Sequence, residues 1–251
     1  MPKLNNILRL VLESKEPIIR NEEMVLQGFS RQEVSRALAA LTRAGEIYKI
    51  SSGLFSKEKI ESLDIFYLAQ KIFSGYLGLT SACYIYGWLE YFPFEIFVIT
   101  ANKSAKKKVG KFFLRTVDFG KRATGSTLFQ NYFISTKGKT LFDIFYKPEF
   151  VGGWKEVMKI VYKSDAGEND WEEFLRFAFK FGSKSFLQRT GYLLCRLKEE
   201  TGKKIPIDLE KLKSKKLVIA KIGSGKTFEF SKDWKIFDCE GEKIFEWFHG
   251  S

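Results

Sequence analysis

The segment "SRQEVSRALAALTRAGEIYKISSGLFS", residues 30–56, predicts a helix followed by a β-hairpin. Ser30 with Glu33 three residues later has the spacing of a capping box, and Gly45 suits the end of the helix. The runs on either side of "SSG" read as two short strands. Apolar residues recur at the spacing of one helical face and form a single stripe: Val34, Ala37, Leu38 and Leu41.

The residues before this segment predict two more helices. In "NNILRLVLE", residues 5–13, the apolar side chains have helical spacing, and Pro17 ends the run. "IRNEEMVLQGF", residues 19–29, predicts a second, shorter helix that closes near Gly28. Three helices and then a hairpin is the order of a winged helix-turn-helix, whose third helix enters the DNA major groove. We therefore expect a winged-helix DNA-binding domain over residues 1–57.

The outer face of the third predicted helix carries side chains that match base edges. Arg31 or Arg36 is suited to guanine and Gln32 to adenine, because their donors and acceptors fit those bases in pairs. The alternative is a small helical domain with a solvated polar face. The predicted DNA contacts, including those of the hairpin with phosphate or the minor groove, are Arg31, Gln32, Ser35, Arg36, Arg43, Lys49, Ser51 and Ser52.

The rest of the chain mixes helices with grouped strands. Residues 58–75 predict one amphipathic connecting helix. Residues 76–165 contain the strand-like runs "FEIFVIT", "KFFLRTVD" and "QNYFIST" followed by helices, and form a predicted middle domain. Residues 166–251 predict a helical pair and a terminal β-hairpin. The predicted fold class is α+β: an N-terminal winged helix-turn-helix followed by a mixed α+β C-terminal region.

The chain is strongly basic. It has 42 Lys and Arg against 30 Asp and Glu, a formal net charge of +12, which favours a polyanionic partner. Between the first two predicted strands lies a basic loop that would bind a second stretch of DNA backbone or an acidic or RNA-like partner; the alternative is a solvated run of charge. This second basic patch consists of Lys106, Lys107, Lys108 and Lys111.

The composition excludes several kinds of site. His249 is the one histidine, so triads that need a histidine base and histidine-ligated metal sites have no candidates. Cys83, Cys195 and Cys239 are far apart and give neither a disulfide frame nor zinc-ligand spacing. We expect no catalytic residue, metal or cofactor. The most hydrophobic region is interrupted by charges and a proline, so we expect no membrane span and a cytoplasmic protein.

One stretch imitates a phosphate-binding loop: "AKIGSGKT", residues 220–227. Such a loop needs a strand before it and a helix after it, because the helix N-terminus and successive N–H groups hold the phosphates. The residues that follow, "TFEFSKDWKIFD", read as strand. We therefore expect a β-hairpin that turns at residues 223–225, with glycines that supply positive φ angles, and no NTPase.

Several segments, in order, resemble the AbiEi family of antitoxins and transcriptional regulators from type IV toxin–antitoxin systems of phage defence. These segments are "GEIYKISSGLFS", "YLGLTSACYIYGW", "FVIT", "YFISTKGKTLFDIFYKPEFVGGWKEVMKI" and "LQRTGYLLCRL", and they span nearly the whole chain. The resemblance implies a winged helix that binds repeats in the protein's own promoter and a C-terminal region that opposes a nucleotidyltransferase toxin. It points to Asp143 and the helix around Arg189. The lysines at 106–108 depart from the family pattern.

The predicted function is therefore a non-enzymatic, DNA-binding antitoxin. It would repress its own operon through operator repeats in double-stranded DNA, with self-association on that DNA, and counteract a cognate nucleotidyltransferase toxin with or without a direct complex. The alternative is a stand-alone winged-helix transcriptional regulator whose C-terminal domain senses a ligand or partner. The same N-terminal residues serve both, and a toxin gene next door distinguishes them.

Overall fold

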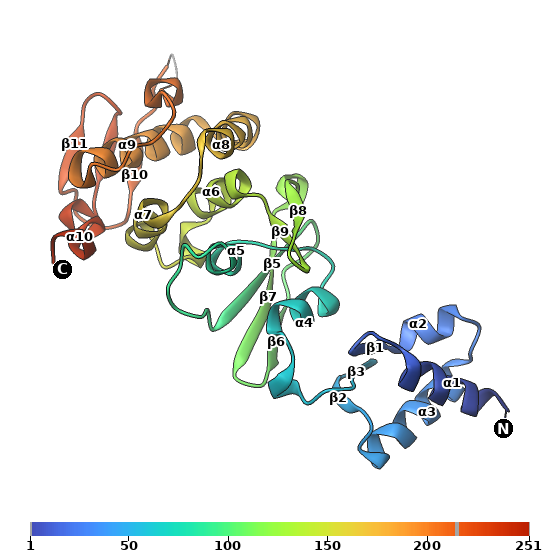
Figure 1. The fold of residues 1–251 in the computed structure, drawn as a ribbon. Coiled ribbons are helices and arrows are strands. Elements are labelled where there is room, and N and C mark those ends of the chain that lie inside the picture. The colour runs from blue at the N-terminus through green and yellow to red at the C-terminus, as the bar shows by residue number, and fades with distance from the viewer. Residues whose placement is uncertain (1, 214–215, 251) are drawn as a thin grey trace.

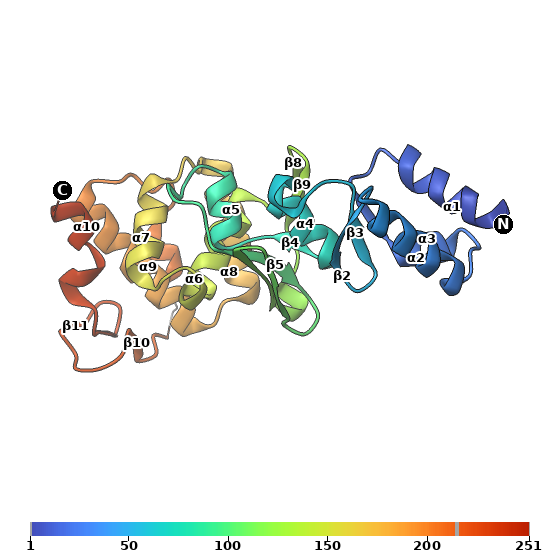
Figure 2. The ribbon, with the colours of Figure 1, turned by 90° about the horizontal axis from the view of Figure 1, so that it is seen from below.

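The structure, a computed structural model, describes residues 2–213 and 216–250 and is elongated (Figures 1 and 2). The N-terminal helices and a three-stranded sheet lie at one end, and a six-stranded sheet lies in the middle. A group of helices with another three-stranded sheet forms the other end. The chain contains both helices and strands, and the strands occur in groups along the sequence instead of alternating regularly with helices. The predicted α+β class is confirmed at this level.

The N-terminal unit contains three helices and a three-stranded sheet. The sheet is antiparallel, and its last strand lies between the other two. The helix expected over residues 19–29 is wrong at its start, because Ile18 and Ile19 are buried in a strand that pairs with residues 54–56. In chain order the elements are α1 (Pro2–Glu13), β1 (Ile18–Arg20), α2 (Asn21–Leu26), α3 (Arg31–Ala44), β2 (Tyr48–Ser51) and β3 (Leu54–Ser56).

Helix α3 has the ends that its sequence predicts. The Ser30 Oγ accepts from the Glu33 N–H at 3.3 Å, and the Glu33 carboxylate accepts from the Ser30 N–H at 2.9 Å. Gly45 ends the helix in the left-handed region, with φ of 77°. The apolar stripe of α3 is buried together with Ile7 and Val11 of α1. The burial of this stripe leaves the opposite face of α3 exposed.

The middle sheet is mixed, with strand order β6-β7-β5-β4-β9-β8. Its pairs are antiparallel except β5 with β7 and β4 with β9, which are parallel. The basic loop expected at residues 106–108 is a strand that pairs with β7, so that expectation is wrong. The strands are β4 (Tyr76–Leu77), β5 (Glu95–Thr100), β6 (Lys106–Val109), β7 (Phe112–Asp118), β8 (Ser126–Phe129) and β9 (Tyr132–Ser135).

Helices cover both faces of this sheet, which explains why β5 is almost entirely buried. On one face lies α4 (Ile65–Ile72), against β4, β5 and β9. The single connecting helix expected over residues 58–75 is instead a short 3₁₀ turn at Ile60–Ser62 followed by α4, which Asp64 caps. The other helices near the sheet are α5 (Thr80–Ile85), α6 (Lys137–Tyr146) and α7 (Trp154–Lys163).

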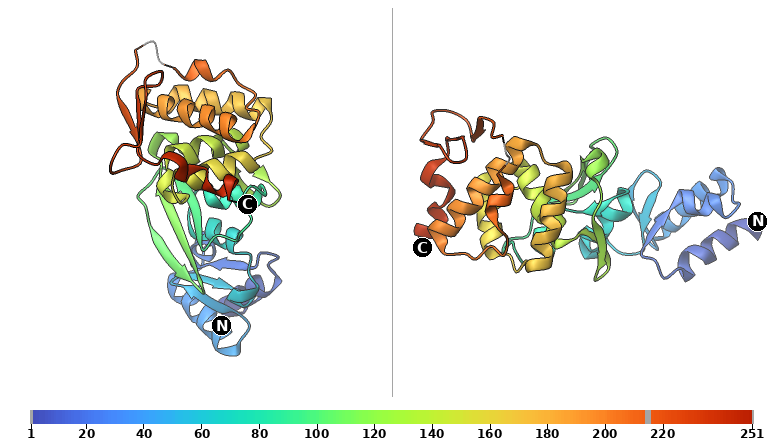
Figure 3. Two further views of the ribbon diagram at one scale, coloured as in Figure 1. Left: turned by 90° about the vertical axis from the view of Figure 1, so that its left-hand side faces the viewer. Right: turned by 90° about the horizontal axis from the view of Figure 1, so that it is seen from above.

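The C-terminal end adds helices and a three-stranded sheet (Figure 3). Strand β12 lies in the centre, parallel to β10 and antiparallel to β11. The hairpin expected to turn at residues 223–225 is therefore wrong, because β10 and β11 flank β12 and do not pair with each other. The elements are α8 (Glu168–Phe181), α9 (Lys184–Thr201), β10 (Ala220–Ile222), β11 (Glu229–Ser231), β12 (Ile236–Asp238) and α10 (Glu246–His249).

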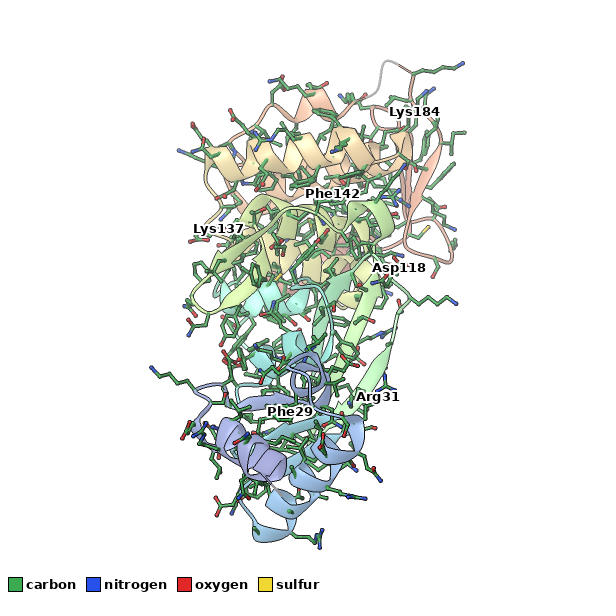
Figure 4. The ribbon with its side chains drawn as sticks, turned by 90° about the vertical axis from the view of Figure 1, so that its right-hand side faces the viewer. Phe29, Arg31, Asp118, Lys137, Phe142 and Lys184 are labelled. Carbon is green, nitrogen blue, oxygen red and sulfur yellow. The ribbon has the colours of Figure 1, made fainter. Side chains whose placement is uncertain are left out.

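A charged pair is enclosed in the core at α6. Lys139 Nζ bonds to the Asp143 carboxylate, and both side chains are 0% exposed. Burial raises the pKa of Asp143 to about 6 and lowers the pKa of Lys139, since both charges lose water. Asp143 is therefore a buried core residue whose partner is Lys139. Four rings lie 5.0–5.8 Å from Lys139 Nζ: Tyr76, Phe119, Phe142, labelled in Figure 4, and Phe177.

Breaking this pair leaves one charge buried without its partner. We expect Asp143→Ala or Lys139→Ala to lower the free energy of unfolding by about 3–5 kcal/mol. The double variant with Lys139→Met and Asp143→Leu should recover most of that loss, because both charges are then gone. Urea unfolding followed by circular dichroism measures all three. Single variants within about 1 kcal/mol of the parent would contradict the assignment.

Candidate nucleic-acid interface

The exposed face of α3 carries the side chains that were expected to read DNA. Arg31 and Ser35 stand one turn apart, and both are exposed. Gln32 and Arg36 also stand one turn apart, in the row of side chains beside Arg31 and Ser35. Arg43 lies on the same side near the end of the helix, and Gln32, Arg36 and Arg43 are all exposed. The structure therefore places these five predicted residues on one side of one helix, opposite its buried stripe.

The turn between β2 and β3 lies beside the start of α3. Ser52 is exposed and Ser51 half-buried, and Gly53 adopts φ of 71°, which closes the turn. Lys49 is exposed on β2, before a shift in register at Ser51. Ser51, Ser52 and Gly53 line the same cleft as Arg31 and Ser35, so the turn and the first part of α3 form one surface.

This cleft, of about 950 Å³, is shared between the N-terminal unit and the middle sheet. Figure 4 shows Arg31 near one end of the β6–β7 ribbon, and Lys107 of β6 lines the cleft together with Arg31. Burial lowers the pKa of Lys107. The cleft has one carboxylate, Glu22, and four cationic side chains: Arg20, Arg31, Lys71 and Lys107. Such a surface favours anions.

The lysines expected to form a second patch are divided between two faces. Because β6 is a strand, alternate side chains point to opposite sides. Lys107 faces the cleft, whereas Lys106 and Lys108 share the other face with Phe113. On that face Lys106 Nζ bonds to Glu95 at 2.5 Å and lies 4.2 Å from the centre of the Phe113 ring. Lys106 is therefore neutralised locally, and Lys107 is the strand lysine that belongs to the cleft.

The cleft depends on a junction between its two walls. The Tyr67 hydroxyl of α4 donates to the carboxylate of Glu16, which precedes β1, and Lys71 Nζ lies 3.3 Å from the same carboxylate. The hydrogen bond from Tyr67, together with the hydrogen bond and the charge of Lys71, holds the pKa of Glu16 below its usual range. Ile18 and Leu54 of the N-terminal sheet are buried in the core beneath α4. Polar and apolar contacts together fix α3 relative to β6.

Sequence reasoning missed several residues of the cleft. Arg20 and Leu26 both line it, and Leu26 is 86% exposed. Recognition of β1 at residues 18–20 would have placed Arg20 beside the hairpin, since Arg20 pairs with Leu54 of β3. Arg189, implied by the family resemblance, lies outside the cleft on α9, where burial lowers its pKa.

The described residues also bear on metal sites, membrane spans and the glycine-rich loop at residues 220–227. Within residues 2–213 and 216–250, no group of three or more His, Cys, Asp or Glu could hold a metal ion. The same residues contain no helix with the length and apolar character required to cross a bilayer. Gly223 and Gly225 have the expected positive φ angles, and a strand follows them, so the helix that a phosphate-binding loop needs is missing there.

The comparisons with known proteins identify a solved structure with a similar fold. No family model matches the sequence, and no curated protein matches it. Among solved structures, the chain is similar to the crystal structure of the RV2827C protein from Mycobacterium tuberculosis, with a TM-score of 0.57 and 14% identity. The match covers 100% of this chain and 96% of that one. At this identity the likeness concerns the fold alone.

The junction makes a prediction about pH. Tyr67→Phe removes the first donor to Glu16, so the pKa of Glu16 should rise toward its ordinary value. Because that pKa is lowered in the folded protein, its stabilising contribution is present above the ordinary pKa and is lost as pH falls through the lowered one. NMR titration of the Glu16 carboxyl measures the shift. Tyr48→Phe is the control, and an unmoved Glu16 pKa in Tyr67→Phe would exclude this contact.

Proposed function

We propose that residues 1–57 form a winged helix that binds double-stranded DNA in a sequence-dependent manner. Helix α3 lies in the major groove, where Arg31, Gln32 and Arg36 contact base edges, and the turn at Ser51 and Ser52 contacts the backbone. The observation that supports this most is the combination on one surface of an exposed Arg- and Gln-bearing helix face with an adjacent hairpin turn.

The cleft supplies the electrostatic part of the proposed interface. A DNA strand that flanks the occupied major groove runs between α3 and β6, where Arg20 and Lys107 face its phosphates. These contacts position the duplex and carry no sequence information themselves. The middle sheet thus takes part in DNA binding through one side of β6.

We further propose that the protein is a cytoplasmic, non-enzymatic antitoxin that represses its own operon and counteracts a nucleotidyltransferase toxin. This step rests on the ordered resemblance to the AbiEi family. Its test is co-expression with the nucleotidyltransferase encoded beside it. Relief of growth arrest supports the antitoxin function, and the absence of any such toxin leaves a stand-alone regulator with the same DNA-binding surface.

The recognition helix makes a specific prediction. Replacement of Arg31 or Arg36 by Ala should weaken binding to the DNA upstream of the gene by roughly 1–3 kcal/mol each, because a paired contact with a base is lost. Binding to unrelated duplexes should fall much less. Fluorescence anisotropy with both duplexes measures the ratio. Arg176→Ala, which removes an exposed arginine from α8, is the matched control. Unchanged preference in the α3 variants would exclude this face as the reader.

The two faces of β6 make a second prediction. Lys107→Gln should weaken binding to every duplex alike and reduce the slope of log affinity against log salt by about one, since one phosphate contact is lost. Lys108→Gln is the matched control, because its side chain lies on the other face of the strand. Equal effects of the two substitutions would show that the cleft does not hold the DNA.

A further inference from the structure

The small C-terminal sheet exposes aromatic rings on its outer face. Register places Lys221 of β10, Phe237 of β12 and Phe230 of β11 in one row across the three strands. The ring centres of Phe230 and Phe237 are 4.6 Å apart. Phe230 is 40% exposed, and Phe228, two residues earlier, is 64% exposed. Contiguous exposed apolar side chains bordered by polar residues are typical of interaction surfaces.

The carboxylates of these three strands lie on the opposite face. Asp238 is buried there and accepts hydrogen bonds from the Tyr192 hydroxyl and from Arg196, both at 2.9 Å. Glu229 pairs with Asp238 in register, so it belongs to the same side. Strand alternation thus leaves the outer face of β10, β11 and β12 with aromatic and lysine side chains and without a carboxylate.

Lysines border the rings at both ends of the sheet. Lys226 is exposed in the loop that follows β10, and Lys221 Nζ donates to the Gly225 carbonyl of that loop at 3.1 Å. At the other end, Lys232 and Lys235 are exposed in the turn between β11 and β12. The glycine-rich loop that imitates a phosphate-binding loop therefore lies beside an aromatic surface, and its lysine contributes positive charge there.

We propose that this face binds a single-stranded polynucleotide. Bases stack on Phe230 and Phe237, and the lysines neutralise the phosphates on either side. A duplex is a poorer ligand because its base faces are already stacked inside the helix. RNA and DNA bind alike, since stacking and phosphate contacts do not involve the 2′-hydroxyl. This site is separate from the cleft at α3 and does not depend on the proposed function.

The test uses the full-length protein and a fluorescent 12-nucleotide strand of mixed sequence, as RNA and as DNA, with the matching duplex for comparison. Fluorescence anisotropy should show that both single strands bind, and the Phe230 variants test whether they bind through the C-terminal sheet. Phe230→Leu keeps an apolar side chain but loses the ring, and should lower single-strand affinity about tenfold. Phe230→Trp should restore it. Phe179→Leu, at a phenylalanine 50% exposed on α8, is the matched control and should change nothing.

Two further measurements make the test decisive. The double variant with Arg31→Ala and Arg36→Ala should lose duplex recognition and keep single-strand binding through Phe230, so failure here and failure of the proposed function are distinguishable. Polyphosphate of matched charge, which has no bases, should compete much less well than the oligonucleotide. The proposal is overturned if Phe230→Leu, with an unchanged melting temperature, binds the single strands as tightly as the parent. Equal competition by polyphosphate would also overturn it.

Discussion

Burial of Ile18 and Leu54 beneath α4 is the contact on which the candidate interface depends. These two side chains come from the N-terminal sheet, yet they complete the core of the sheet that follows. Ile50 of the same sheet packs against this core as well, and the polar contacts of Glu16 add to the junction. These contacts hold the two walls of the cationic cleft against each other.

Much of the N-terminal unit could be predicted from the sequence because its signals are local. The apolar stripe of α3, its capping box and Gly45 each act within one or two turns of helix. Strands β1 and β6 could not be found in the same way. β1 has three residues, and its partner β3 lies far along the chain. β6 consists mostly of lysines, which are uncommon in strands, although its partner β7 follows directly after a short turn at Gly110 and Lys111.

The part of the candidate site that lies on α3 could be predicted because its signals are local in the sequence. Residues on α3 share a face by helical spacing, so Arg31 and Arg36 could be grouped without a structure. The lysines at 106–108 look equivalent in sequence, and strand geometry separates Lys107 from its neighbours. Arg20 joins the cleft only through tertiary packing, which no local pattern encodes.

The order of strands in the C-terminal sheet has a consequence for biosynthesis. β12 is the last of its three strands to be made and the one in the centre, so β10 and β11 have no hydrogen-bonding partner while the ribosome still holds residues 236–238. Tyr192 and Arg196 of α9 likewise lack their hydrogen-bond acceptor until Asp238 has been synthesised. The N-terminal unit, whose sheet closes at residue 56, can fold long before. A nascent chain would thus present a folded N-terminal unit while its C-terminal end remains unfinished.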